Sequence, residues 1–196
     1  MKGRTYLAVG CRFAWIGSYR VIPVGWILIS AEGIVMEIPV MNADGTPSAD
    51  ETVLLTLSTS QILKTEANFT GKDLPAIFFY PTPGRPNTRE MRDRIRMSQN
   101  VPGLWFDPSS SEERYKRFVV LMRMNLPDKI EFKIQQSLSS VGDYSEIGSS
   151  RSYQALARLI APPSKKLEAI TSSADVASGS TPITHVNPRP SSVRTP

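Results

Sequence analysis

Apolar and β-branched side chains are concentrated between Tyr19 and Leu57, where they alternate with polar ones. Successive strand residues point to opposite faces of a sheet, so apolar residues at every second position indicate a strand with one buried face. One such run consists of Ile34, Met36, Ile38 and Val40. Residues 52–57 repeat the alternation after the turn-forming residues 42–47, which predicts two antiparallel strands joined by an open loop. Pro39 lacks a backbone N–H and therefore indicates an edge strand or a bulge.

A second pair of strands is predicted between Phe118 and Gln135. Residues 118–124 alternate, and after the turn-forming residues Pro127 and Asp128 a second run alternates apolar with polar positions. Alternation on both sides of a Pro-Asp turn is typical of a β-hairpin. We therefore expect the apolar residues of the second run to share one face of a strand: Ile130, Phe132 and Ile134.

Further elements complete the expected body. Residues 5–16 are apolar enough for a first strand, and residues 76–80 form a short strand before a proline-rich surface loop. Short helices are expected from capping signals and helical spacing of apolar residues, at 58–63, 87–97, from 109 onward, and at 152–161. The predicted fold class is α+β and β-rich, with an antiparallel sheet or a sandwich-like or barrel-like body and two to four short helices.

The chain is expected to divide into one folded domain and a tail. Residues 1–161 hold the predicted strands and helices and form a single β-rich globular domain. Residues 162–196 contain no Phe, Trp or Tyr and are dominated by Ser, Thr, Pro and Ala. Such a segment cannot bury enough apolar area to offset its conformational entropy, so we expect a disordered tail. No apolar run is long enough for a transmembrane helix, and no signal-peptide cleavage pattern is present.

An arginine-rich segment provides the candidate binding site. The net charge of +5 favours acidic partners such as nucleic acid or anionic lipid, although basic proteins also use such a charge for solubility alone. The candidate residues are Arg85, Arg89, Arg92, Arg94 and Arg96. Together with Glu90 and Asp93 they leave a local excess of three positive charges. The alternative is a solvated helix face whose ion pairs stabilise the protein little.

The residues needed for common catalytic and metal sites are scarce. His185 is the only histidine and lies in the predicted tail, and Cys11 is the only cysteine. A His-dependent nucleophilic triad and a Cys/His zinc site are therefore excluded. Adjacent Glu112 and Glu113 would not face each other on a helix, and electrostatics at a helix start explains them better. We predict no enzyme, metal, cofactor or small-molecule substrate, and the lone cysteine fits a reducing compartment such as the cytoplasm.

A small basic β-rich body, the arginines of residues 85–96 and a Ser/Thr/Pro-rich tail together resemble the matrix proteins of negative-strand RNA viruses in general layout. Residues 161–164 and 80–83 come near the proline-rich budding signals of that family without matching them. The resemblance implies self-association into a layer, contact with the inner face of a membrane, binding to nucleocapsid and residence in the virion. It implies no catalytic residue.

Three functional hypotheses follow. The first is a non-enzymatic, self-assembling homo-oligomer that binds an anionic membrane surface or nucleocapsid through residues 85–96. About 1 kcal/mol for each net basic residue is too weak to hold a monomer on lipid, but linked copies would add their contacts. The second is a nucleic-acid-binding coat or silencing-type module that uses the same arginines on phosphates, with strongly salt-dependent affinity. The third is an enzyme of unknown class.

Overall fold

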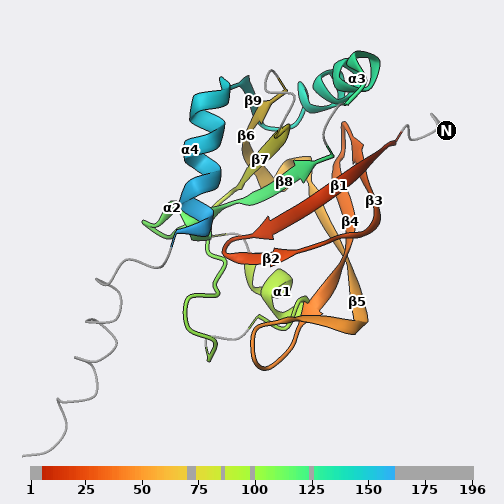
Figure 1. Ribbon diagram of the computed structural model, residues 1–196. Coiled ribbons are helices and arrows are strands. Elements are labelled where there is room, and N and C mark those ends of the chain that lie inside the picture. The colour runs from red at the N-terminus through yellow and green to blue at the C-terminus, as the bar shows by residue number, and fades with distance from the viewer. Residues whose placement is uncertain (1–5, 70–73, 85–86, 98–99, 124–125, 162–196) are drawn as a thin grey trace, which may run out of the picture. The chain divides into compact units, whose positions relative to one another are not determined.

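One long strand, β1 (Leu7–Ile16), belongs to both sheets of the fold (Figure 1). The computed structural model describes residues 6–69, 74–84, 87–97, 100–123 and 126–161. The first half of β1 pairs with β3 (Val24–Ser30), and its second half pairs with β2 (Tyr19–Val21) and β8 (Phe118–Met122). The register along β8 shifts between Cys11 and Phe13, and such an irregularity bends a strand so that it can pass from one sheet to another.

The two halves of the strand order define two layers. Sheet A contains the first half of β1, then β3, β4 (Gly33–Met41) and the edge strand β5 (Pro47–Ser58). Sheet B runs from the second half of β1 through β8, β7 (Ala76–Pro81), β6 (Ile62–Asn68) and β9 (Asp143–Glu146). Only β9 pairs in parallel among the described strands. The β-rich α+β class predicted from the sequence is confirmed, and the layers form a sandwich.

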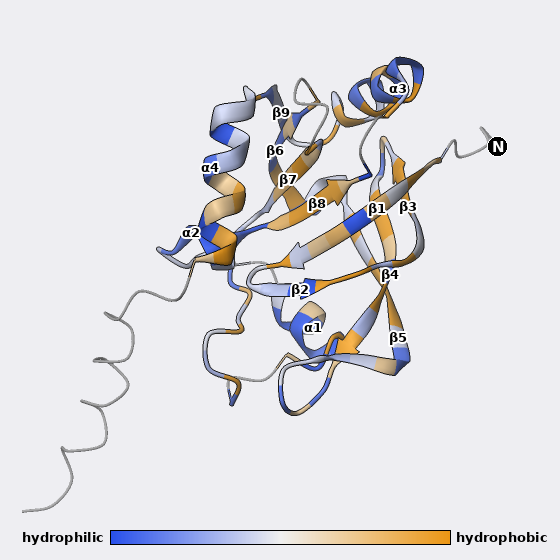
Figure 2. Ribbon diagram, in the orientation of Figure 1, coloured by the Kyte–Doolittle hydropathy of each residue, from blue (hydrophilic) through white to orange (hydrophobic). Residues whose placement is uncertain are grey.

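The main hydrophobic core lies between the sheets. The alternating residues of β4 are all buried, as predicted, and the first three belong to this core: Ile34, Met36, Ile38 and Val40. Helix α1 (Asn87–Arg94) adds Met91, and helix α3 (Asp128–Leu138) adds Ile134 and Leu138. In Figure 2, β7 and β8 are largely hydrophobic on the ribbon, α1 is largely hydrophilic, and α3 alternates between hydrophilic and hydrophobic residues. None of the described helices is long and apolar enough to cross a membrane.

Helix α4 (Ser149–Ile160) covers the outer face of sheet B and creates a second, smaller core (Figure 1). Its Leu156 and Leu159 are buried against Trp15, Phe78 and Val119 of the sheet. The short helix α2 (Glu113–Lys116) lies beside α4 and leads into β8. This second core fixes the position of α4 relative to β6 and β7.

The second hairpin predicted from the sequence is wrong in its second half. Residues 118–122 form β8, but the run that contains Ile130, Phe132 and Ile134 is helix α3. Ile130, Ile134 and Leu138 are four residues apart and line one helix face, whereas Phe132 is 64% exposed. Apolar residues four positions apart lie on one face of a strand, which repeats every two residues, and on one face of a helix, which repeats about every 3.6. The acidic residues in the first turn favour the helix, because they face the positive end of its dipole.

Of two smaller predictions, one needed correction and one is confirmed. The expected helix at 58–63 is a single 3-10 turn, Thr59–Gln61, although the predicted capping box between Ser58 and Gln61 is present. Leu63 belongs to β6 and is 59% exposed rather than buried. The prediction of an edge position or a bulge at Pro39 is confirmed as a bulge, because the register between β4 and β5 shifts just after this residue. Strand β4 is central in sheet A, but its pairing with β3 ends at Glu37, so Pro39 is paired only with Thr52 of β5. The predicted disordered tail, residues 162–196, lies outside the described residues and stays a prediction.

A pair of substitutions in α3 separates the helix from the predicted strand. Ile134→Ala should lower the free energy of unfolding by about 2–4 kcal/mol, because it removes a buried side chain. Phe132→Ala should change it by less than about 0.5 kcal/mol, because this ring faces solvent. Urea unfolding followed by circular dichroism measures both values, and equal losses at the two positions would support the strand.

Candidate functional site

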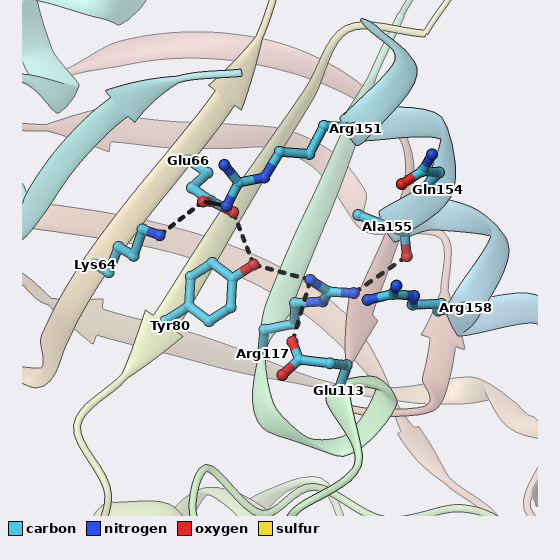
Figure 3. Close-up of a pocket in the computed structure, with 9 residues that line it drawn as sticks. All are labelled: Lys64, Glu66, Tyr80, Glu113, Arg117, Arg151, Gln154, Ala155 and Arg158. Atoms are coloured by element: carbon cyan, nitrogen blue, oxygen red, sulfur yellow. Dashed lines mark hydrogen bonds and ion pairs between the residues drawn. The ribbon is translucent and has the colours of Figure 1, made fainter. Parts of the chain in front are cut away.

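A cavity of about 480 Å³ opens between helix α4 and strands β6 and β7, and we call it the α4 cavity (Figure 3). Five parts of the chain line it: β6, β7, α2, the link from α2 to β8, and α4. The lining residues are Lys64, Glu66, Tyr80, Glu113, Arg117, Arg151, Gln154, Ala155 and Arg158. Most of them are charged or polar, so the cavity differs from the apolar pockets that bind most small molecules.

Arg117 is a buried cation that joins the walls of the α4 cavity. Its side chain is 3% exposed, and its Nη1 donates a hydrogen bond of 2.9 Å to the Tyr80 hydroxyl. Its Nη2 donates to the carbonyl oxygen of Ala155 in α4 at 3.2 Å, and a carboxylate oxygen of Glu113 lies 3.6 Å from Nη1. The guanidinium also lies over the ring of Phe78, 5.4 Å from its centroid. Since burying a charge is costly without partners, these contacts explain how Arg117 is held inside the protein.

Glu66 is the buried anion of the opposite wall. Its side chain is 3% exposed, and its carboxylate accepts hydrogen bonds from Lys64 Nζ (2.7 Å), the Tyr80 hydroxyl (2.8 Å) and Arg151 Nη2 (2.5 Å). Burial alone would raise the pKa of Glu66, but the hydrogen bonds from Lys64 and Tyr80 and the charges of Lys64 and Arg151 outweigh it. The pKa therefore lies below its ordinary value, and the carboxylate is ionised at neutral pH.

Tyr80 connects the buried cation to the buried anion. Its hydroxyl accepts a hydrogen bond from Arg117 and donates one to Glu66. Burial is the main cause that raises the pKa of Tyr80, so the hydroxyl keeps the proton that it donates. The chain of bonds from Glu113 through Arg117 and Tyr80 to Glu66 ties α2, α4, β7 and β6 together (Figure 3).

Helix α4 presents donors to the cavity that the protein itself does not use. The side chains of Arg158 and Gln154 are exposed. Within the described ranges, neither side chain has a hydrogen bond or an ion pair. Arg151 is bonded to Glu66, yet its side chain remains 64% exposed. Four cationic residues and two carboxylates line the cavity, which leaves an excess of two positive charges. Such a set of donors can hold an anionic group through charge-assisted hydrogen bonds.

The arginines predicted from the sequence lie in other surroundings. Arg85 falls outside the described residues. Arg89 is largely exposed, with its Nε 3.9 Å from a carboxylate oxygen of Asp93. Arg92 is used internally, because its Nη1 donates a hydrogen bond of 2.9 Å to the Phe106 carbonyl and its guanidinium stacks over Trp105.

The remaining two arginines point to strand β5. Arg96 forms an ion pair with Glu51 of β5. Arg94 is exposed, has no bonded partner among the described residues, and lines a groove of about 230 Å³ with Glu90 and Ser58. The structure thus leaves Arg89 and Arg94 accessible, while Arg92 and Arg96 contact other parts of the fold. Anion binding by this segment stays a prediction.

Sequence reasoning missed the α4 cavity, although part of its signal is visible. Arg151, Gln154 and Arg158 occur at i, i+3 and i+7, which places them along one side of a helix opposite the apolar residues. Nothing in the sequence around Arg117 or Glu66 indicates burial, because Tyr80, Arg151 and Ala155 are distant from them in the chain. Among the residues that the structure describes, no three His, Cys, Asp or Glu side chains gather as a metal site.

Comparison with known families gives the fold its context. The family described as the SENP6/SENP7 PH-like domain matches residues 6–160, which include every described strand and helix from β1 to α4. The chain belongs to the SENP6/SENP7 PH-like domain family. No curated protein and no solved structure matches the chain.

Membership of the SENP6/SENP7 PH-like domain family overturns the resemblance to viral matrix proteins. That resemblance depended on a basic β-rich body, an arginine-rich segment and a polar tail, and it contained no specific motif. Unrelated proteins share these general features, because charge and polar tails follow from solubility as well as from function. A matrix role, a virion location and nucleocapsid binding inferred from it are therefore withdrawn.

The charge network of the α4 cavity predicts a pH dependence of stability. The pKa of Glu66 is lower in the folded protein than in the unfolded chain, so its contribution is complete above the unfolded value and is lost as pH falls through the folded value. The free energy of unfolding should therefore decrease as pH falls below about 4.5, the ordinary pKa of this glutamate. Glu66→Gln should be less stable at pH 7 and should depend less on pH over this acidic range.

Urea unfolding between neutral and acidic pH measures both variants. Glu90→Gln, at an exposed position on α1, is the matched control and should follow the wild-type curve. Parallel curves for wild type and Glu66→Gln would contradict the assignment of this pH dependence to Glu66.

Proposed function

We propose that this PH-like domain is a non-catalytic binding module that holds an acidic segment of a protein partner in the α4 cavity. The observation that carries the proposal is the pair of unbonded side chains, Arg158 and Gln154, beside a network whose other charges are paired. A carboxylate or phosphate group of the partner would accept hydrogen bonds from both. The exposed part of Arg151 would supply a third contact.

Preorganisation supports this use of the cavity. Arg151 is held by Glu66, which in turn is held by Lys64 and Tyr80, and the carbonyl of Ala155 anchors α4 to Arg117. The donors of α4 therefore lie on a helix that is fixed to the sheet by bonds and by packing. Binding loses less entropy when a side chain is already held in position, as Arg151 is by Glu66.

The size and chemistry of the cavity favour a polar group over an apolar ligand. Its volume of about 480 Å³ is that of an ordinary ligand site, but charged side chains make up most of its lining. Tyr80 keeps its proton and has both bonding partners inside the network, so it is not placed to act as a base. No lining residue pairs a nucleophile with a general base, which supports a binding role.

A second candidate is binding of anionic lipid or RNA through α1. The exposure of Arg89 and Arg94 favours it. The hydrogen bond of Arg92 to the Phe106 carbonyl and the exposed ion pair of Arg96 with Glu51 reduce the charge that α1 and the turn after it can offer to such a partner. The two candidates use different surfaces, so the same variants distinguish them.

Titration with a defined acidic peptide tests the proposal. A hexaglutamate peptide and its counterpart with one phosphoserine should shift the NMR signals of the Nε–Hε groups of Arg151 and Arg158. Arg158→Gln should weaken binding about tenfold or more, since it removes a charge-assisted hydrogen bond. Arg94→Gln is the matched control, because it removes the same charge from the distant α1 and should leave the affinity unchanged.

Two results would contradict the proposal. One is binding of both peptides that is unchanged in Arg158→Gln, and the other is no binding at all. Binding of anionic vesicles or single-stranded RNA that is lost in Arg94→Gln and retained in Arg158→Gln would establish the second candidate in its place.

A further inference from the structure

Strand β5 is a long edge strand with an unprotected half. It extends over 12 residues and pairs only with β4 among the described strands. Proteins usually protect such edges with charges or proline, and residues 47–51 contain Pro47, Asp50 and Glu51. Residues 52–58 contain no charge, proline or glycine. Helix α1 lies beside this half, because Thr56 and Ser58 share a groove with Arg94. No described strand pairs with the open side of β5, so its backbone groups can still pair with another strand.

The main-chain groups of this half point to the open edge. The carbonyl of Pro39 points away from β5, because it accepts a hydrogen bond from the Tyr19 hydroxyl. The Pro39 nitrogen carries no hydrogen and so cannot donate a hydrogen bond to β5. Thr52 is the partner of Pro39 in the register. Since backbone direction alternates along a strand, Thr52, Leu54 and Thr56 direct their N–H and C=O groups away from β4.

Leu54 also exposes apolar surface at this edge. Its side chain is 56% exposed on the outer face of sheet A. In the register of the sheet, Glu37 of β4 lies next to Leu54, and Val24 of β3 lies beyond Glu37. The Val24 side chain is 46% exposed. Trp26 on β3 is 63% exposed. Exposed apolar side chains beside unpaired backbone groups are typical of an interaction surface.

We propose that two copies of the chain pair through β5, antiparallel and centred on Leu54, to form a dimer with one continuous sheet. A two-fold axis through Leu54 places it opposite the Leu54 of the second copy and places Thr52 opposite Thr56. The backbone groups that are open in one copy then bond to those of the other. Both outer faces lie on the same side of the joined sheet, because side chains alternate with a period of two.

Charge complementarity at the ends of the pairing favours a second copy as the occupant. In this register Asp50 lies opposite Ser58 of the other copy. Ser58 lines the groove beside Arg94, and Arg94 has no bonded partner among the described residues. The Asp50 carboxylate likewise has none there. The dimer would place this carboxylate near that guanidinium twice, once at each end of the paired strands.

Cysteine cross-linking tests the proposed register. Cys11 is the only cysteine and is buried, so an introduced thiol is the only accessible one. Directly opposed residues on antiparallel strands lie within the Cα separation that a disulfide spans. Leu54→Cys should form a disulfide-linked dimer under mild oxidation. Phe132→Cys, at an equally exposed position on α3, is the matched control and should remain monomeric.

Sedimentation of the unmodified chain measures the dimer directly. We expect a concentration-dependent dimer with dissociation in roughly the micromolar range, as for interfaces of modest area. Asp50→Arg and Arg94→Asp should each weaken it about tenfold, and the double variant should regain affinity. A monomer at about 100 μM without the Leu54 cross-link would overturn the proposal, as would equal cross-linking of both cysteine variants. Dimers that do not respond to either charge change would overturn the register.

Discussion

The buried guanidinium of Arg117 is the constraint on which the rest of the candidate site depends. A charge that is 3% exposed needs partners on several sides, and here β7, α2 and α4 each provide one. These bonds fix the position of α4 along sheet B beyond what the packing of Leu156 and Leu159 requires. The backbone positions from which the donors of α4 reach the cavity are therefore fixed.

The part of the fold that could be predicted from sequence is the part with local signals. The alternation in β4 and β5 with a turn between them is enough to give the two antiparallel strands and their buried face, but not the register shift after Pro39. The interval of four between Ile130 and Ile134 carries no such information, because it suits a helix as well as a strand. There the helix formed because Leu138 extends the same stripe into the core.

The candidate site was less predictable for a physical reason. The sequence shows that residues 85–96 are the densest positive segment. A charged side chain can bind a partner only where the fold leaves it without an internal contact. Arg92 and Arg96 are engaged with Trp105 and Glu51, whereas Arg158 is isolated in sequence and unbonded among the described residues. Family membership fixed the class of domain, and the side-chain network supplied the candidate surface.

Hydrogen exchange of the α4 amides in Arg117→Met tests the dependence of α4 on Arg117 most directly. The variant replaces the guanidinium with an apolar side chain of similar length. It therefore removes the bonds to Tyr80, Glu113 and Ala155. We predict that α4 amides exchange about tenfold faster or more, while β4 amides are unchanged, because the helix loses its polar anchor and the main core does not. Exchange in α4 as slow as in the wild type would contradict the account.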